Sequence, residues 1–296
     1  MNESPKKILV VGGVAAGASF AARARRHSEI AEITLIERGP DVSFANCGLP
    51  YYIGGEIPGR DALAVQTPQT LKSMLNLEVR TRTEAVEVDV SGKHLKVRSL
   101  ARGEEEWLPY DTLMLAPGAK PMRPPIPGIE DPRIRVLRNL EDMDAIKEDA
   151  ATANRACVIG AGFIGLEMAE QLHRLGIGVT LVELQEQVLP PLDREMALLV
   201  ESELRQNGVD LVLGDGIARF EPATDGLHCQ LASGKSIPAD LVVLSIGVQP
   251  DTALARTAGL ELGPRGHIVV DEFQRTSAPR IYAGGDAVVS RDRVFG

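Results

Sequence analysis

A short apolar run, a glycine-rich turn and an amphipathic segment follow one another at the start of the chain. "KKILVV", residues 6–11, is apolar up to the break at Gly12 and Gly13. "AAGASFAARARRH", residues 15–27, places its small residues on one face and its arginines on the other, which predicts a helix. "EITLIE", residues 32–37, predicts the next buried strand. The order is therefore strand, turn, helix and strand.

The same order returns in the middle of the chain. "RACVIG" (155–160) predicts a strand, "AGFIGLEMAEQLHRLG" (161–176) a helix, and "GVTLVE" (178–183) a second strand ending in glutamate. Each copy is a βαβ unit. Two such units predict an α/β fold with two doubly wound, Rossmann-like dinucleotide-binding domains.

The segments around the βαβ units indicate where the domains begin and end. "VEVDVSGKHLKVRSL" (86–100) alternates around a Ser-Gly turn, as does "HCQLASGKSIPADLVVLSIG" (228–247), which predicts a hairpin after each unit. Proline-rich "GAKPMRPPIPGIEDP" (118–132) reads as a linker. We expect "RIYAGGDAVV" (280–289) to return to the first sheet. The predicted domains are 1–120 and 249–296, forming one discontinuous domain, and 121–248.

Composition and charge narrow the class of protein. The 296 residues are 44% apolar and 25% charged, typical of an ordinary globular chain, and the net charge of −9 argues against a nucleic-acid partner. No segment reaches the roughly 18 apolar residues of a membrane span. The apolar N-terminal run is interrupted by glycines and is not a signal peptide. Three cysteines without a C-x-x-C favour a reducing, cytoplasmic location.

The two glycine-rich turns differ. Gly160, Gly162 and Gly165 form an unbroken G-x-G-x-x-G between a strand and a helix, which is typical of a site where pyrophosphate approaches the backbone. Glu183, at the end of the next strand, suits the ribose hydroxyls and would repel a 2′-phosphate, so NADH is favoured and NADPH stays possible. In the first turn, valine replaces the second motif glycine, so this turn alone is ambiguous. Glu37 still has the ribose-binding position.

Two later stretches carry a resemblance to a known family. "LMLAPGAKP" (113–121) and "TSAPRIYAGGDAV" (276–288) resemble the FAD motifs of the pyridine nucleotide-disulfide oxidoreductases, in which the aspartate of the second motif binds the flavin ribityl chain. "SFANCGLPYYIGG" (43–55) and the valine-containing turn are similar to the branch that holds coenzyme A-disulfide reductases and NAD(P)H persulfide reductases. Relatives with two redox cysteines have C-x4-C, and here Tyr52 stands at the second position.

The resemblance implies a set of site residues, with Cys47 as the catalytic thiol. For FAD it implies Gly12, Gly13, Ala16, Gly17, Glu37, Arg38, Ala116, Gly118, Gly285 and Asp286. For NAD(H) it implies Gly160, Gly162, Phe163, Ile164, Gly165, Glu167, Glu183 and Gly247. For a coenzyme A-bearing substrate it implies Ser19, Arg23, Arg26, Ser43 and Asn46. No metal-ligand spacing is present, and Cys157 and Cys229 are expected to be packing residues.

The expected reaction passes electrons from NAD(P)H through FAD to Cys47, which reduces coenzyme A disulfide, a persulfide or a polysulfide. Two alternatives stay open: an NADH oxidase or peroxidase that cycles Cys47 through sulfenic acid, and a non-catalytic flavoprotein redox sensor. Members of the family usually continue into a C-terminal interface domain of roughly a hundred residues, which pairs two subunits. We expect a homodimer where that domain is present. A C-terminal rhodanese module is a further possibility.

Overall fold

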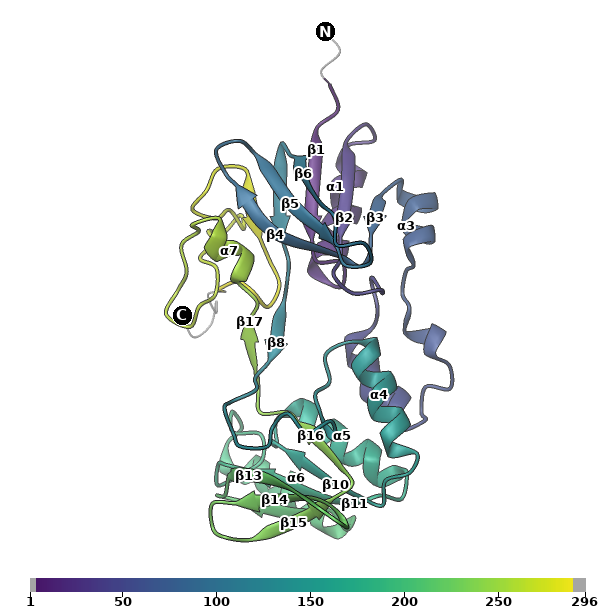
Figure 1. Ribbon diagram of the computed structural model, residues 1–296, viewed down its shortest axis with the longest axis vertical. Helices are drawn as coiled ribbons and strands as arrows, with labels where there is room; N and C mark the ends of the chain where they lie inside the picture. The colour runs from purple at the N-terminus through teal and green to yellow at the C-terminus, as the bar shows by residue number, and fades with distance from the viewer. Residues whose placement is uncertain (1–3, 290–296) are drawn as a thin grey trace. The chain divides into compact units, whose positions relative to one another are not determined.

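The chain forms two compact units. The structure, a computed structural model, describes residues 4–289. Unit 1 holds the described residues of Met1–Ala45, Ala64–Lys120 and Gln249–Gly296, and unit 2 holds Asn46–Leu63 and Pro121–Val248. Figure 1 shows the elements of each unit.

Unit 1 is built on a five-stranded parallel sheet in the order β18-β7-β1-β2-β3. Its elements are β1 (Lys7–Val11), α1 (Ala16–His27), β2 (Glu32–Ile36), α3 (Pro68–Leu75), β3 (Glu78–Arg80), β7 (Thr112–Leu115) and β18 (Ile281–Ala283). Val10 is fully buried and pairs with Leu35 on one side and Met114 on the other. The prediction that residues 280–289 return to the first sheet is confirmed, because β18 pairs with β7.

An antiparallel sheet of three strands completes this unit. It consists of β4 (Thr83–Asp89), β5 (His94–Ser99) and β6 (Glu105–Pro109), with the short helix α7 (Ala253–Thr257) packed against β4. The turn at Ser91 and Gly92 joins β4 to β5, which confirms the hairpin predicted from the alternating pattern.

Unit 2 repeats the parallel plan in the order β12-β11-β10-β16-β9. Its elements are β9 (Ile134–Arg135), α4 (Leu140–Ala150), β10 (Arg155–Ile159), α5 (Phe163–Arg174), β11 (Gly178–Glu183), α6 (Arg194–Gln206), β12 (Asp210–Leu213), β13 (Ile217–Ala223), β14 (Gly226–Leu231), β15 (Ser236–Ala239) and β16 (Leu241–Leu244). β13, β14 and β15 form an antiparallel sheet, as the second alternating segment predicts. The α/β class is confirmed.

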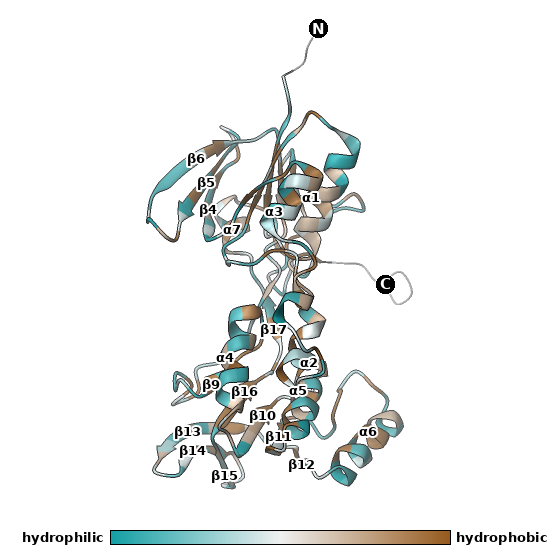
Figure 2. Ribbon diagram, turned by 90° about the vertical axis from the view of Figure 1, so that its right-hand side faces the viewer, coloured by the Kyte–Doolittle hydropathy of each residue, from teal (hydrophilic) through white to brown (hydrophobic). Residues whose placement is uncertain are grey.

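Residues 46–63 belong to unit 2, although the chain on both sides of them belongs to unit 1. They form η1 (Asn46–Gly48), α2 (Leu49–Ile53) and η2 (Arg60–Leu63). Leu49, Ile53 and Leu63 are almost completely buried, and α2 lies beside α4 and α5 (Figure 2). The sequence placed this segment in the first domain, because the contacts that hold it come from residues distant along the chain.

Two short strands pair where the chain passes from one unit to the other. β8 (Ala119–Pro121) and β17 (Val248–Pro250) form a two-stranded sheet where the chain passes between the units. Among the described residues, no helix is both long and apolar enough to cross a membrane.

Candidate functional site

The turn after β10 has the geometry of a phosphate-binding turn. Gly160 has a left-handed backbone with φ of +98°, and a Cβ there would lie 2.5 Å from the carbonyl oxygen of Ser245. A Cβ at Gly165 would lie 1.8 Å from the oxygen of Gly160, so α5 can approach β10 only because this residue is glycine. Around Gly162 the position of a Cβ is open space, with no atom within 4 Å.

The turn after β1 repeats this geometry in unit 1. Gly12 has φ of +92°, and a Cβ there would lie 2.0 Å from the oxygen of Ala116. A Cβ at Gly17 would again lie 1.8 Å from the oxygen of the first glycine. Val14 stands where unit 2 has Gly162, and its side chain is half-buried. The valine therefore leaves the two constrained glycine positions of the turn intact.

The glutamate at the end of the second strand is fixed in the same way in both units. Glu37 accepts hydrogen bonds from the N–H groups of Gly13 (2.7 Å) and Gly39 (2.8 Å). Glu183 accepts them from Ala161 (2.7 Å) and Gln185 (2.9 Å). A carboxylate offers about four acceptor sites, so each glutamate keeps capacity for two ribose hydroxyls.

A backbone hydrogen bond also joins each glycine turn to the loop that follows the glutamate. The N–H of Ser43 donates to the oxygen of Gly13 (2.8 Å), and the N–H of Leu189 donates to the oxygen of Ala161 (2.9 Å). Both residues have a left-handed backbone, with φ of +47° for Ser43 and +45° for Leu189. This conformation is strained for a residue with a side chain, and both units accept it at the same place.

The helices behind the turns are suited to anions. The first N–H groups of a helix have no partner within the helix and carry partial positive charge. Neither α1 nor α5 has a capping side chain at its N-cap, Ala15 and Gly162, and neither has an acidic residue in its first turn. Each helix has twelve residues, long enough for a well-formed N-terminus. Both helix ends therefore fit the phosphates of a dinucleotide.

The remaining FAD-motif residues gather at one edge of the unit 1 sheet. β1, β7 and β18 are parallel, so Gly12, Ala116 and Asp286 follow their carboxyl ends, where open α/β sheets bind ligands. Asp286 is exposed in the turn after β18. A Cβ at Gly285, where φ is +78°, would lie 3.0 Å from that of Ala16, which brings this turn against α1.

Two flanking residues of this edge are tied together. The oxygen of Gly118 accepts the N–H of Asp251 (2.9 Å), and Arg38 forms an ion pair of 3.5 Å with the carboxylate of Asp251. The Arg38 side chain is itself largely exposed. Gly118 and Arg38, two of the residues that the resemblance implies for FAD, therefore both contact Asp251.

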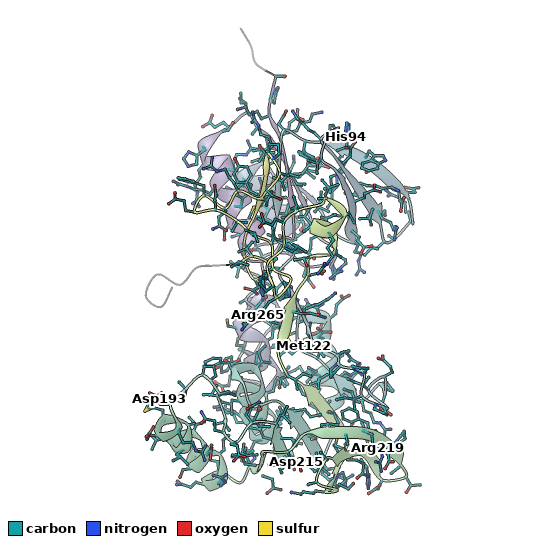
Figure 3. All side chains as sticks on the ribbon, turned by 90° about the vertical axis from the view of Figure 1, so that its left-hand side faces the viewer. His94, Met122, Asp193, Asp215, Arg219 and Arg265 are labelled. Atoms are coloured by element: carbon teal, nitrogen blue, oxygen red, sulfur yellow. The ribbon has the colours of Figure 1, made fainter. Side chains whose placement is uncertain are left out.

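The residues that the resemblance implies for NAD(H) lie in unit 2 around the carboxyl ends of β10, β11 and β16. Phe163 and Ile164 begin α5, and their side chains are 68% and 40% exposed. Gly247 follows β16 with φ of +109°, and its oxygen accepts the N–H of Met122 (3.0 Å), a residue labelled in Figure 3. Apolar surface beside the turn is what a nicotinamide ring would cover.

Cys47 is the exposed cysteine of the chain. It lies in η1 beside exposed Asn46, whereas Cys157 and Cys229 are fully buried in the core of unit 2. The pKa of the Cys157 thiol is raised by its hydrogen bond with Cys229 and by burial. The two buried thiols are thus packing residues, as predicted, and only Cys47 is accessible for chemistry.

Carboxylates surround the helix that follows Cys47. The pKa of Tyr51 is raised, first by the negative charge of Glu167 and then by burial and by Glu170. The pKa of Glu167 is itself raised by burial and by the charge of Glu170. Glu167 therefore faces the Cys47 segment and lies on α5, the helix that begins at the glycine turn of unit 2.

The arginines of α1 divide into two kinds. Arg23 and Arg26 are exposed, as is Ser19 on the same helix. Neither the Arg23 nor the Arg26 guanidinium group is hydrogen-bonded or ion-paired within residues 4–289. Arg25 instead donates to five carbonyl oxygens, which the sequence did not indicate beyond its different helical face. Its acceptors are Ser28, Glu29, Ala31, Leu75 and Asn76.

Sequence reasoning missed the residues that hold the Cys47 segment on unit 2. Lys147 and Gln171 lie on α4 and α5, and both contact the stretch around Tyr52 and Gly54. Neither belongs to a local motif, so no pattern along the chain could have indicated them. Within the part of the chain that the structure describes, no group of three or more potential metal ligands is clustered.

Known proteins that are similar to this chain belong to one family. The family model described as pyridine nucleotide-disulphide oxidoreductase matches residues 6–294. The solved structure of reduced Bacillus anthracis CoADR-RHD is 47% identical, with a TM-score of 0.94 over 97% of this chain and 52% of that one. An NAD-dependent persulfide reductase from A. fulgidus is 44% identical, with a TM-score of 0.92 over 95% and 53%.

A curated relative of different activity is also similar. An NADH oxidase of Enterococcus faecalis is 33% identical over 285 residues, which are 96% of this chain and 64% of the relative. The chain thus spans about half to two thirds of the proteins it matches. Because the family model covers nearly the whole chain, the chain belongs to the pyridine nucleotide-disulphide oxidoreductase family.

Proposed function

We propose that this chain is the dinucleotide-binding part of a single-cysteine reductase that uses NAD(P)H and FAD to reduce coenzyme A disulfide or a persulfide or polysulfide. The observation that carries the proposal is the single exposed thiol, Cys47, in a chain with two dinucleotide turns. Names of similar proteins support the substrate class, since they include CoADR-RHD and a persulfide reductase.

FAD fits unit 1 and NADH fits unit 2. In unit 1, Gly12 and Gly17 would keep the turn tight and the helix close behind it so that the pyrophosphate meets the N-terminus of α1, Glu37 would hold the adenosine ribose, and Asp286 would bind the ribityl chain. In unit 2, Gly162 leaves the backbone open and Glu183 favours NADH over NADPH. When bound, FAD would supply the transfer of two electrons from the nicotinamide toward a sulfur atom.

The chemistry at Cys47 follows from thiol–disulfide exchange. The Cys47 thiolate attacks one sulfur of the substrate S–S bond, forming a mixed disulfide and releasing the other sulfur as a thiolate. Two electrons from NADH then cleave the mixed disulfide, which restores the Cys47 thiolate and releases the second thiolate. With one proton from NADH and one from solvent, the products are two thiols, or a thiol and hydrogen sulfide.

Cations on α1 suit a substrate with phosphates. Arg23 and Arg26 are three residues apart, face solvent with Ser19, and carry charges that are not neutralised within the described residues. We assign this face to the phosphates of coenzyme A. Ser43 and Asn46 precede Cys47 by four residues and one residue, and we propose that they contact the sulfur end of the substrate.

An NADH oxidase or peroxidase is the second candidate, and the Enterococcus faecalis relative favours it. In that case Cys47 would react with peroxide and be reduced back from sulfenic acid. We further propose a cytoplasmic location, and a homodimer where the C-terminal interface domain is present.

The test is anaerobic NADH consumption with coenzyme A disulfide, and separately with a coenzyme A persulfide. The Cys47→Ser variant should lose turnover while NADH still bleaches its flavin. Consumption that depends on oxygen or peroxide instead would support the oxidase or peroxidase.

A further inference from the structure

The Cys47 segment leaves unit 1 and returns to it at almost the same point. Phe44 and Ala64 form an antiparallel bridge, and the oxygen of Ser43 accepts the N–H groups of Val65 (2.9 Å) and Gln66 (3.2 Å). Residues 46–63, here the Cys47 excursion, are therefore closed at their base. The position of Cys47 within the excursion then depends on what the excursion contacts in unit 2.

Lys147 of α4 contacts main-chain oxygens of α2, the helix that follows Cys47. Its ammonium group donates to the carbonyl oxygens of Tyr52 (2.7 Å) and Ile53 (3.3 Å), and lies 4.4 Å from the centre of the Tyr52 ring. The last carbonyls of a helix have no partner within the helix, and a cation at this end also suits its negative partial charge. Lys147 thus caps α2.

Gln171 of α5 holds the residues that follow α2. Its side chain lies so close to Gly54 that a Cβ there would be 1.9 Å from Oε1. Its Nε2 donates to Glu56 (2.8 Å), which also forms an ion pair with Arg174 at 3.3 Å. Gln171 is fully buried, so this contact leaves little freedom for the excursion.

A separate ion pair holds the far end of the excursion. Arg60 and Asp144 are 2.9 Å apart, and Asp144 lies on α4 one turn before Lys147. Helix α4 therefore contacts the excursion at two places, and the Lys147 contact is the one on α2, the helix that follows Cys47.

We propose that Lys147 is a positioning residue for Cys47: by capping α2 it holds the Cys47 excursion in one orientation on α4 and α5. Cys47 is joined to α2 through Gly48 alone, and Gly48 is already the N-cap of that helix. A rotation or shift of α2 therefore moves the Cys47 sulfur directly. Removal of the ammonium group would deprive two carbonyls of their charged donor, which is the stronger kind of hydrogen-bond donor.

The experiment compares Lys147→Met, which keeps the length of the side chain, with Lys147→Arg, which keeps the charge and the donors. Two rates are measured on the flavin-loaded protein: labelling of Cys47 by a small thiol reagent, and reduction of the flavin by NADH. We expect the labelling rate in Lys147→Met to change by about threefold or more, to return near wild type in Lys147→Arg, and flavin reduction to stay within about twofold. Labelling reports on Cys47 because the other two cysteines are buried.

Lys235→Met is the matched control, since Lys235 lies in the exposed turn between β14 and β15 of the same unit. It should change neither rate. An unchanged labelling rate in Lys147→Met, or a parallel change in both rates that arginine does not correct, would overturn the proposal. If Lys147→Met does not fold, Lys147→Gln, which keeps an N–H donor, is judged by the same two rates.

The proposal rests on the proposed function only in that Cys47 is the reacting thiol. Labelling needs no disulfide substrate, so it decides the positioning role even if coenzyme A disulfide is not turned over. Failure of Cys47→Ser to abolish turnover would reject the proposed function and leave the labelling result unaffected.

Discussion

Glu183 accepts a hydrogen bond of 2.7 Å from the backbone N–H of Ala161, the residue that follows the first glycine of the unit 2 turn. Glu37 forms the same bond, of the same length, with Gly13 in unit 1. In both units, a βαβ motif thus fixes its acidic side chain at the end of the second strand. The same carboxylate orders the turn and is the group that we propose binds a ribose.

Replacement of Glu183 by glutamine should change the choice of nucleotide. The neutral amide keeps one acceptor for the backbone but removes the charge that repels a 2′-phosphate. We expect the KM for NADH to rise about tenfold and the ratio of NADPH to NADH efficiency to increase, since the loss of one charge-assisted bond is of that size. Steady-state kinetics with both nucleotides measure it. Glu37→Gln is the control: it should weaken FAD retention without altering the nucleotide ratio.

Alanine at two glycines of equivalent motifs should have opposite consequences. At Gly162, φ is −76° and a Cβ meets no atom within 4 Å, so Gly162→Ala should fold normally. Its methyl group would nevertheless occupy the path of the pyrophosphate, raising the KM for NADH about tenfold or more. At Gly12 the Cβ would collide with the Ala116 oxygen, and Gly12→Ala should lose about 3 kcal/mol or more of stability together with its FAD.

Thermal unfolding and flavin content, measured beside kinetics, separate these two effects. A Gly162→Ala variant with normal NADH affinity would show that the nucleotide does not approach this turn. A stable, flavin-loaded Gly12→Ala variant would contradict the close contact between Gly12 and Ala116.

The arginines of α1 offer a test of the coenzyme A site. Arg23→Ala and Arg26→Ala remove exposed charges and should leave the melting temperature unchanged, while the KM for coenzyme A disulfide rises about three- to tenfold. The rise should shrink at high salt, because exposed charges are screened. A small disulfide without phosphates should be unaffected. An equal rise in KM for coenzyme A disulfide and for the small disulfide would show that Arg23 and Arg26 do not bind the phosphates of coenzyme A.

Arg25→Ala should behave differently from its neighbours. It deprives five carbonyl oxygens of their donor, so the free energy of unfolding should fall by about 2 kcal/mol or more. Denaturant unfolding measures this fall. A variant of unchanged stability would contradict the observed contacts.

Glu167 should make stability depend on pH. Burial and Glu170 raise its pKa in the folded chain, so the folded state disfavours its charged form. This destabilisation is absent below the pKa of Glu167 in the unfolded chain, which is about 4.3. It is complete above the raised pKa of Glu167 in the folded chain. Glu167→Gln should therefore melt like the wild type at about pH 4 and at a higher temperature at about pH 8. A lower melting temperature at the higher pH would show that Glu167 is stabilised as an anion.

The sequence predicted what local patterns determine. The strand, glycine turn and helix around Gly12 and Gly160 are each set by neighbouring residues, and the structure confirms them. The return of β18 could be predicted because a lone apolar strand needs a sheet to join. The position of the Cys47 excursion could not. It depends on Lys147 and Gln171, which lie far along the chain from the residues they contact.

Other features escaped prediction for similar reasons. Ser43 and Leu189 share a left-handed backbone that neither residue type favours, because the bond to the turn imposes it. The five bonds of Arg25 involve carbonyls at the ends of α1 and α3, whose proximity only the fold creates. Contacts between residues distant along the chain thus determine these backbone conformations and hydrogen bonds, which a local sequence pattern does not encode.

The central claim is that Cys47 carries the substrate sulfur as a mixed disulfide. The direct measurement is mass spectrometry of the flavin-loaded protein after anaerobic incubation with coenzyme A disulfide, before and after addition of NADH. The account predicts a mass gain of one coenzyme A moiety on the peptide that contains Cys47, absent in Cys47→Ser and removed by NADH. Turnover of the disulfide with no adduct on this peptide, and undiminished in Cys47→Ser, would contradict it.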